Sequence, residues 1–212
     1  MSRWIGVLLL LTGLVIGGYS FFEWHTGKTA AQNLSSEEIA DFKKIENEAD
    51  MELKVAPTLP KAAPSPLLTS DIKRELGEKT ALLLIPKIEQ KYSVYWGTDE
   101  DTLKKGVGMY VSDLTTVPGG YGHTVLSGHR DTVFTKLAEL EVRDNLLVEY
   151  EDKVYIYEIA AMWITDEDDR SVIVEKDEST LTLTTCYPFD FIGSAPDRYI
   201  VQAKLVSTQS AK

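Results

Sequence analysis

The strongest constraint on the fold comes from the stretch after about residue 75, where short runs of β-forming residues alternate with turn residues. Gly119-Gly120 and Glu151-Asp152 are two of these turns. Many short strands without an internal repeat indicate an all-β domain, and we favour a closed barrel over a sandwich. Within this stretch only residues 133–140 are expected to form a helix. The candidate strands are residues 81–86, 92–96, 124–127, 145–150, 153–164, 180–186 and 198–206.

An uncharged segment, residues 4–22, precedes everything else and is rich in leucine, valine, isoleucine and glycine. About 20 apolar residues cross a bilayer, whereas the apolar core of a signal peptide has about 7–15. The far end lacks a small-x-small cleavage pattern and carries aromatic residues typical of a membrane interface. The positive charges of Arg3 and the α-amino group favour an N-terminus on the inner side of the membrane. We therefore expect an uncleaved single-pass anchor, residues 1–24, in the cell membrane, with the remainder extracellular.

The segment from residue 25 to residue 74 has a different composition. Ser35 and Glu38 form a capping box, and apolar residues at three- and four-residue steps predict an amphipathic helix over 34–53. Its other face is acidic, which disfavours binding to an anionic membrane and favours packing on the body or on a partner. Prolines at 57, 60, 64 and 66 predict an extended spacer. The body is then expected over 75–207, active without the preceding segments, with a tail at 208–212.

Cys186 is the only cysteine of the chain, and the formal net charge is -11. This charge disfavours a nucleic-acid partner, which would favour a basic patch. In the expected strand, Leu181 and Leu183 share one face while Thr182 and Cys186 share the other, so the thiol points away from the apolar face. A lone thiol outside the cell forms no internal disulfide, and we prefer a nucleophile to a small buried hydrophobe or a link to another chain.

A reactive thiol needs a neighbouring base or cation. His25 lies beside the membrane segment, whereas His123 and His129 bracket a predicted strand, and their spacing does not decide between them. For acyl transfer an arginine can stabilise the oxyanion. Arg198 faces outward at the start of a strand and shares one loop with Cys186. The competing arginines are Arg130, Arg143 and Arg170.

These residues resemble the sortases, cysteine transpeptidases of Gram-positive cell surfaces. The Thr-Leu-x-Thr-Cys signature of that family corresponds to residues 182–186, its Gly-His element to Gly128-His129, and its arginine strand to the segment that begins at Arg198. Residues 84–88 resemble the first strand of the family, and Pro118-Gly119-Gly120 precedes the histidine as in sortases. The resemblance implies a sortase-like eight-stranded β-barrel with short helices, preceded by the transmembrane helix.

Carried over to this chain, the resemblance implies that Cys186 is the nucleophile, His129 the general acid and base, and Arg198 the ligand of the oxyanion or substrate carbonyl. Sortases cleave a Leu-Pro-x-Thr-Gly-like signal of secreted proteins after its threonine and transfer the acyl group to an amine of a lipid-linked peptidoglycan precursor. The resemblance implies no cofactor. The acidic run at 166–169 lacks a liganding pattern, so we expect no metal. Residues expected to bind the signal are Val172, Ile173, Val174 and Thr185.

The forms Cys-Tyr-Pro-Phe and Gly-His-Arg-Asp-Thr, with a short N-terminal anchor, are most similar to class D sortases. Three other functions stay open at this point. They are a pilin-polymerising sortase, a cysteine peptidase or transpeptidase that acts on peptidoglycan stem peptides, and a membrane-tethered scaffold whose cysteine joins another chain.

Overall fold

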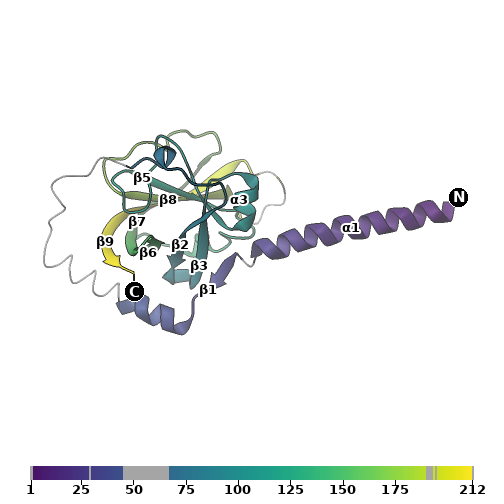
Figure 1. Ribbon diagram of the computed structural model, residues 1–212, viewed down its shortest axis with the longest axis horizontal. Helices are drawn as coiled ribbons and strands as arrows, with labels where there is room; N and C mark the ends of the chain where they lie inside the picture. The colour runs from purple at the N-terminus through teal and green to yellow at the C-terminus, as the bar shows by residue number, and fades with distance from the viewer. Residues whose placement is uncertain (1, 29, 45–66, 190–192, 194, 212) are drawn as a thin grey trace.

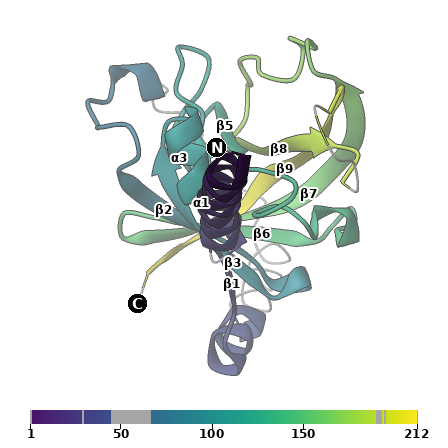
Figure 2. The ribbon, with the colours of Figure 1, turned by 90° about the vertical axis from the view of Figure 1, so that its right-hand side faces the viewer.

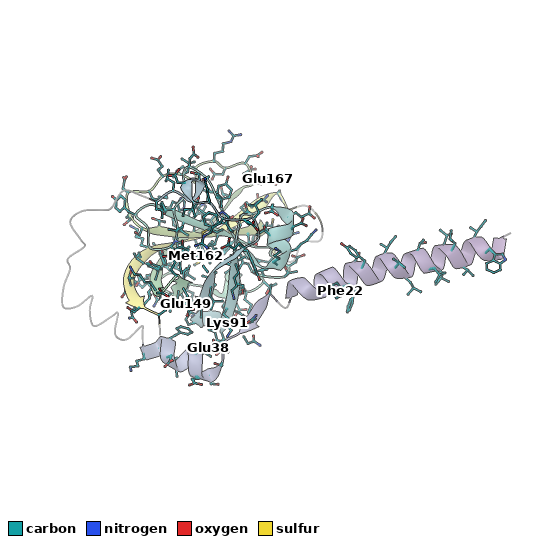
Figure 3. The ribbon with its side chains drawn as sticks, in the orientation of Figure 1. Phe22, Glu38, Lys91, Glu149, Met162 and Glu167 are labelled. Atoms are coloured by element: carbon teal, nitrogen blue, oxygen red, sulfur yellow. The ribbon has the colours of Figure 1, made fainter. Side chains whose placement is uncertain are left out.

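A computed structural model describes residues 2–28, 30–44, 67–189, 193 and 195–211. The chain has two parts, a long N-terminal helix and a body of strands from which that helix projects (Figure 1). The helix, α1, comprises Ser2–Lys28. Its stretch Trp4–Phe22 has 19 residues and a mean hydropathy of 2.1, and none of it is buried against the rest of the protein. The side chains of this stretch, Phe22 among them, point outward (Figure 3). The helix is therefore long and apolar enough to cross a membrane.

The body is a closed barrel. Around the ring the order is β3-β2-β6-β7-β9-β8-β5-β4, and pairing of β3 with β4 closes it, so the expected eight-stranded barrel is confirmed. A ninth short strand, β1, pairs with the other end of the same edge of β3. The strands are β1 Ala31–Asn33, β2 Lys79–Ile85, β3 Gln90–Trp96, β4 Val107–Met109, β5 His123–Ser127, β6 Asn145–Tyr150, β7 Lys153–Asp166, β8 Thr180–Tyr187 and β9 Asp197–Ser210.

All seven expected strands form, whereas β1 and β4, each of three residues, were not expected. The last strand also runs further than expected, because Ser210 still pairs with Lys153 of β7. Figure 2 looks along α1 onto the barrel, with β7, β8 and β9 together on one side. This side carries the candidate site.

Helices are short in the described part of the body. They are residues 36–44, α3 Glu100–Lys105 and the 3-10 turns η1 Thr69–Asp71, η2 Pro86–Ile88 and η3 Leu137–Glu139. The prediction of a helix over residues 133–140 is wrong, since these residues form turns followed by η3. Apolar residues of this segment are nevertheless buried, and both Phe134 and Leu137 are 0 % exposed. β-Branched Thr132, Val133 and Thr135 disfavour a regular helix there.

A second, smaller apolar cluster lies outside the barrel and joins residues 34–44 to it. Leu34 and Phe42, each 6 % exposed, pack with Leu84, Leu147 and Ile156. Successive strand residues face opposite sides, so β2 places Leu83 in the barrel core and Leu84 in this outer cluster. The predicted helix therefore packs on the body. The part of it beyond residue 44 lies outside the described residues.

The predicted capping box forms at the start of this helix. The Ser35 amide donates to Glu38 Oε2 (2.8 Å), and the Glu38 amide donates to Ser35 Oγ (3.2 Å). Glu38 Oε1 also accepts a 2.6 Å bond from Lys91 Nζ of β3. The hydrogen bonds from Lys91 and Ser35 lower the pKa of Glu38 to about 2. Figure 3 shows Glu38 and Lys91 facing each other between helix and barrel. This ion pair fixes the rotation of the helix that places Phe42 inward.

Replacing Phe42 by alanine tests whether the outer cluster supports the barrel. We expect Phe42→Ala to lower the free energy of unfolding by about 3 kcal/mol, because a buried aromatic side chain leaves a cavity. Exposed Lys43→Ala is the matched control and should change it by less than about 0.5 kcal/mol. Urea unfolding of a chain that starts at residue 30 measures both. A second chain that starts at residue 75 lacks the outer cluster. If it unfolds at the same urea concentration as the longer chain, the cluster contributes nothing to the free energy of unfolding.

Candidate active site

Strand β8 ends at the site and carries the single thiol. Leu181 and Leu183 are 0 % exposed and belong to the barrel core. Cys186 is of opposite parity, so it lies on the outer face of the barrel, where it is half-buried. That outer face is not simply a solvated polar face, since Thr182 is also 0 % exposed. The connection between β7 and β8, residues 167–179, covers it there. The outer face is thus closed near Thr182 and open near Cys186.

Strand β9 brings Arg198 next to the thiol. The two strands are antiparallel, and Cys186 is directly opposite Arg198 in their register. The guanidinium is held by three acceptors: Nη2 donates to Glu167 Oε2 (3.0 Å), and Nη1 donates to the carbonyls of Ala195 (3.2 Å) and Asp197 (3.0 Å). Arg198 is therefore fixed at the base of the β7–β8 connection, one strand away from Cys186.

Strand β5 brings His129 to the same end. It runs parallel to β8 with Ser127 opposite Thr184, and the Gly128 amide continues the pairing to the Thr184 carbonyl (3.2 Å). Extending this register by two residues brings the backbone of His129 level with Cys186. The amides of Val133 and Phe134 both donate to the His129 carbonyl, at 3.1 and 2.8 Å, and hold the loop in place. His129 is half-buried.

The loop before His129 requires glycine at 128. A Cβ there would lie 2.8 Å from the ring of Phe134, a buried core residue. Thr185, 3 % exposed, donates from Oγ1 to the Gly128 carbonyl (2.7 Å). Its hydroxyl therefore joins β8 to the histidine loop, and the substrate contact expected for Thr185 stays a prediction.

His123, the other candidate histidine of the body, begins β5 and is fully buried. Its ring nitrogens contact the Val174 carbonyl (Nδ1, 2.8 Å) and Thr182 Oγ1 (Nε2, 2.7 Å). Burial lowers the pKa of His123, and the charge of Lys176 lowers it further, against the opposing effect of the Val174 bond. The structure separates His123 from the cysteine by the length of the strand, since it pairs with Thr180 at the start of β8.

The three apolar residues expected to bind the signal have different surroundings. Val172 is buried, while the carbonyl of Val174 accepts from His123. Ile173 is half-buried and lines a hollow of about 480 Å³ between this connection and the segment after β4. Glu167, the partner of Arg198, lines the same hollow. The remaining lining residues are Tyr110, Ser112, Asp113, Leu114, Asp168, Asp169 and Arg170.

In the acidic run at 166–169, Glu167 pairs with Arg198, while Asp166 and Asp169 accept hydrogen bonds from nearby residues of the chain. Asp166 accepts from the Asp168 amide (2.9 Å), and Asp169 accepts from Ser171 and Thr165. Hydrogen bonds from Ser171 and Thr165 lower the pKa of Asp169. Among the described residues no group of three histidine, cysteine or acidic side chains is placed to hold a metal ion.

An eight-stranded barrel that gathers a cysteine, an arginine and a histidine at one end has the architecture of a cysteine transpeptidase. The model of the family described as Sortase domain matches residues 83–206, and the chain therefore belongs to the sortase family of cysteine transpeptidases. The resemblance drawn from the three motifs is confirmed.

Sortase D of Bacillus subtilis (strain 168) is similar to the chain over nearly its whole length. The two are 36 % identical over 208 residues, which cover 98 % of this chain and 100 % of the relative. The catalytic domain of B. anthracis SrtD is 55 % identical, with a TM-score of 0.58, and the match covers 74 % of this chain and 100 % of that domain. A Clostridium perfringens Sortase D5 transpeptidase is 27 % identical, with a TM-score of 0.57 and coverages of 76 % and 89 %. The chain is thus class D-like among sortases.

Proposed function

We propose that this sortase cleaves a Leu-Pro-x-Thr-Gly-like sorting signal after its threonine and transfers the acyl group to an amine of a lipid-linked peptidoglycan precursor. The observation that carries the proposal is the strand register. The β8–β9 pairing sets Cys186 opposite Arg198, and the β5–β8 pairing brings His129 to the same level. Nucleophile, proton carrier and oxyanion ligand are thereby supplied from three adjacent strands.

The chemistry assigned to these residues is acyl transfer in two steps. The Cys186 thiolate attacks the threonine carbonyl, and Arg198 donates to the oxyanion that develops. His129 protonates the leaving amine as the C–N bond breaks, which leaves a thioester on Cys186. The acceptor amine then gives a proton to neutral His129 and attacks the thioester, releasing the thiolate. No net proton is gained or lost over the cycle.

The groove for the signal is proposed along the outer face of β5 and β8. By parity this face carries Ser127, Thr184 and Cys186, which are half-buried. Their side chains can therefore form the floor of a groove and contact a bound peptide. Ile173 lines the hollow that Glu167, the partner of Arg198, also lines. An apolar side chain at that place suits the Leu-Pro part of a signal, while the charged pair lies nearer the scissile bond.

The long apolar helix supports a membrane-anchored enzyme with an extracellular catalytic domain. Secreted proteins that carry a sorting signal and lipid-linked precursors are both held at the membrane. An enzyme tethered by one helix meets both at high effective concentration. The proposed location is therefore the outer surface of the cell membrane.

Substituting the thiol and the histidine tests the proposed chemistry. We expect Cys186→Ala to abolish cleavage and transfer, and His129→Ala to lower kcat/KM by about 10²–10⁴-fold, the usual contribution of general acid and base catalysis. Mass spectrometry of the acyl-enzyme formed from a panel of signal peptides, with glycine-based acceptors, measures both. Turnover by a folded Cys186→Ala variant would contradict the mechanism.

The same experiment separates the remaining functions. An acyl-enzyme on stem peptides instead of signal peptides would indicate a peptidoglycan enzyme, and transfer to a pilin lysine would indicate pilus assembly. A disulfide-linked species in non-reducing electrophoresis, without any acyl-enzyme, would indicate a scaffold.

Lysine at position 198 tests the geometry required of the arginine. We expect Arg198→Lys to lower kcat by at least about 10²-fold, because an ammonium group cannot bind Glu167 and the oxyanion with a fixed fork. Arg170→Lys, in the hollow that Glu167 also lines, is the matched control and should stay within about twofold. Single-turnover acylation measures both, and equal rates for the two variants would show that only the charge at 198 matters.

A charge at position 173 tests the groove. We expect Ile173→Glu to raise KM for a signal peptide by about tenfold or more, since burying a charge against an apolar residue is costly. The reaction of Cys186 with iodoacetamide and the midpoint of thermal unfolding should be unchanged. Glu175→Gln, exposed in the same connection, is the control. A folded Ile173→Glu variant with unaltered peptide kinetics would place the signal elsewhere.

A further inference from the structure

The connection between β7 and β8 is held at its start, in its middle and at its end. At its start Glu167 pairs with Arg198, and the Glu167 amide donates to the Pro196 carbonyl (3.1 Å). In its middle His123 of β5 contacts the Val174 carbonyl. At its end Lys204 Nζ of β9 pairs with Glu178 Oε1 (2.6 Å), and the Leu205 amide donates to the Ser179 carbonyl (3.0 Å). Val172 and Ile173 lie between the start of the connection and the bond to His123.

The hydrogen bonds of His123 define its tautomer. A carbonyl oxygen only accepts, so Nδ1 carries the proton and donates to Val174. In the neutral ring Nε2 then accepts from the Thr182 hydroxyl, whose oxygen in turn accepts from Gln202 Nε2 (3.2 Å). The hydrogen bonds of Gln202, Thr182, His123 and Val174 therefore run from β9 across β8 and β5 to the connection, and both ring nitrogens of His123 have a partner. A buried network that is fully satisfied holds its members in one arrangement.

This network lies at one end of the outer face that we assign to the signal. His123 and Thr182 are 0 % exposed, whereas Ser127, Thr184 and Cys186, further along the same face, are half-buried. The point at which the face becomes covered is the point at which Val174 is bound. The position of Val174 therefore sets where the open floor ends.

We propose that His123 is a positioning residue, which binds Val174 through Nδ1 and so fixes the closed end of the signal groove and the placement of Ile173. The inference rests on the proposed function only for the identity of the groove. His123 takes no part in proton transfer. It acts on the affinity for the peptide through the β7–β8 connection.

Substitution of His123 by asparagine or by glutamine distinguishes the roles of its two ring nitrogens. An asparagine amide nitrogen reaches the place of Nδ1 and can still donate to Val174, whereas a glutamine amide reaches the place of Nε2 and leaves the Val174 carbonyl without this donor. In the full-length chain in detergent micelles, we expect His123→Gln to raise KM for a signal peptide about tenfold, with kcat within twofold of the unaltered protein. His123→Asn should raise KM by less than threefold.

Two further measurements keep the outcome interpretable. Hydrogen exchange of the amides at 167–179 should be faster in His123→Gln than in His123→Asn, and the rate of Cys186 with iodoacetamide should be equal in both. If His123→Gln does not fold, His123→Leu replaces it with the same expectations. Equal KM values for the two amide variants, or equal exchange of the connection, would overturn the proposal. If the unaltered chain turns over no signal peptide, the proposed function fails, and the exchange comparison alone decides whether His123 fastens the connection.

Discussion

The site depends on the pairing of β8 with a parallel strand on one side and an antiparallel strand on the other. The parallel partner, β5, ends at the same edge as β8, so the loop with His129 emerges beside the thiol. The antiparallel partner, β9, begins at that edge, so Arg198 is opposite Cys186. Closure of the barrel leaves these strands no freedom to slide, because a shift by one residue would turn Leu181 and Leu183 out of the core. The relative placement of the three side chains is therefore a property of the whole barrel.

Most of the barrel could be predicted from the sequence because its strands are long enough to show a pattern. Strands β2, β3 and β5 to β9 have at least five residues each, bounded by turn residues. Strands β1 and β4 have three residues, and Val107-Gly108-Met109 has no alternation that marks a strand. The helix predicted after His129 was wrong for the opposite reason, because the segment shows a pattern that its structure does not follow. Phe134 and Leu137 have helical spacing, but they are held inward by turns between the histidine loop and η3.

The site was predictable in part. Alternation along β8 correctly placed the thiol on the face opposite Leu183, and the shared loop correctly suggested that Arg198 lies close by. Spacing alone did not choose between His123 and His129, because both flank β5 and the choice depends on the direction in which β5 pairs with β8. The pairings of Glu167 with Arg198 and of Val174 with His123 span 31 and 51 residues. Such contacts carry no local pattern in the sequence.

Two of the contacts that hold the β7–β8 connection, Glu167 with Arg198 and Val174 with His123, differ in chemistry. Glu167 and Arg198 are partly exposed, so water and substrate reach this ion pair, and the guanidinium can exchange one acceptor for another at modest cost. The bond to Val174 comes from the His123 ring, which is 0 % exposed, and a buried polar group left without a partner would be costly. In the proposed mechanism Arg198 can therefore exchange Glu167 for the oxyanion, while the bond between His123 and Val174 holds the middle of the connection.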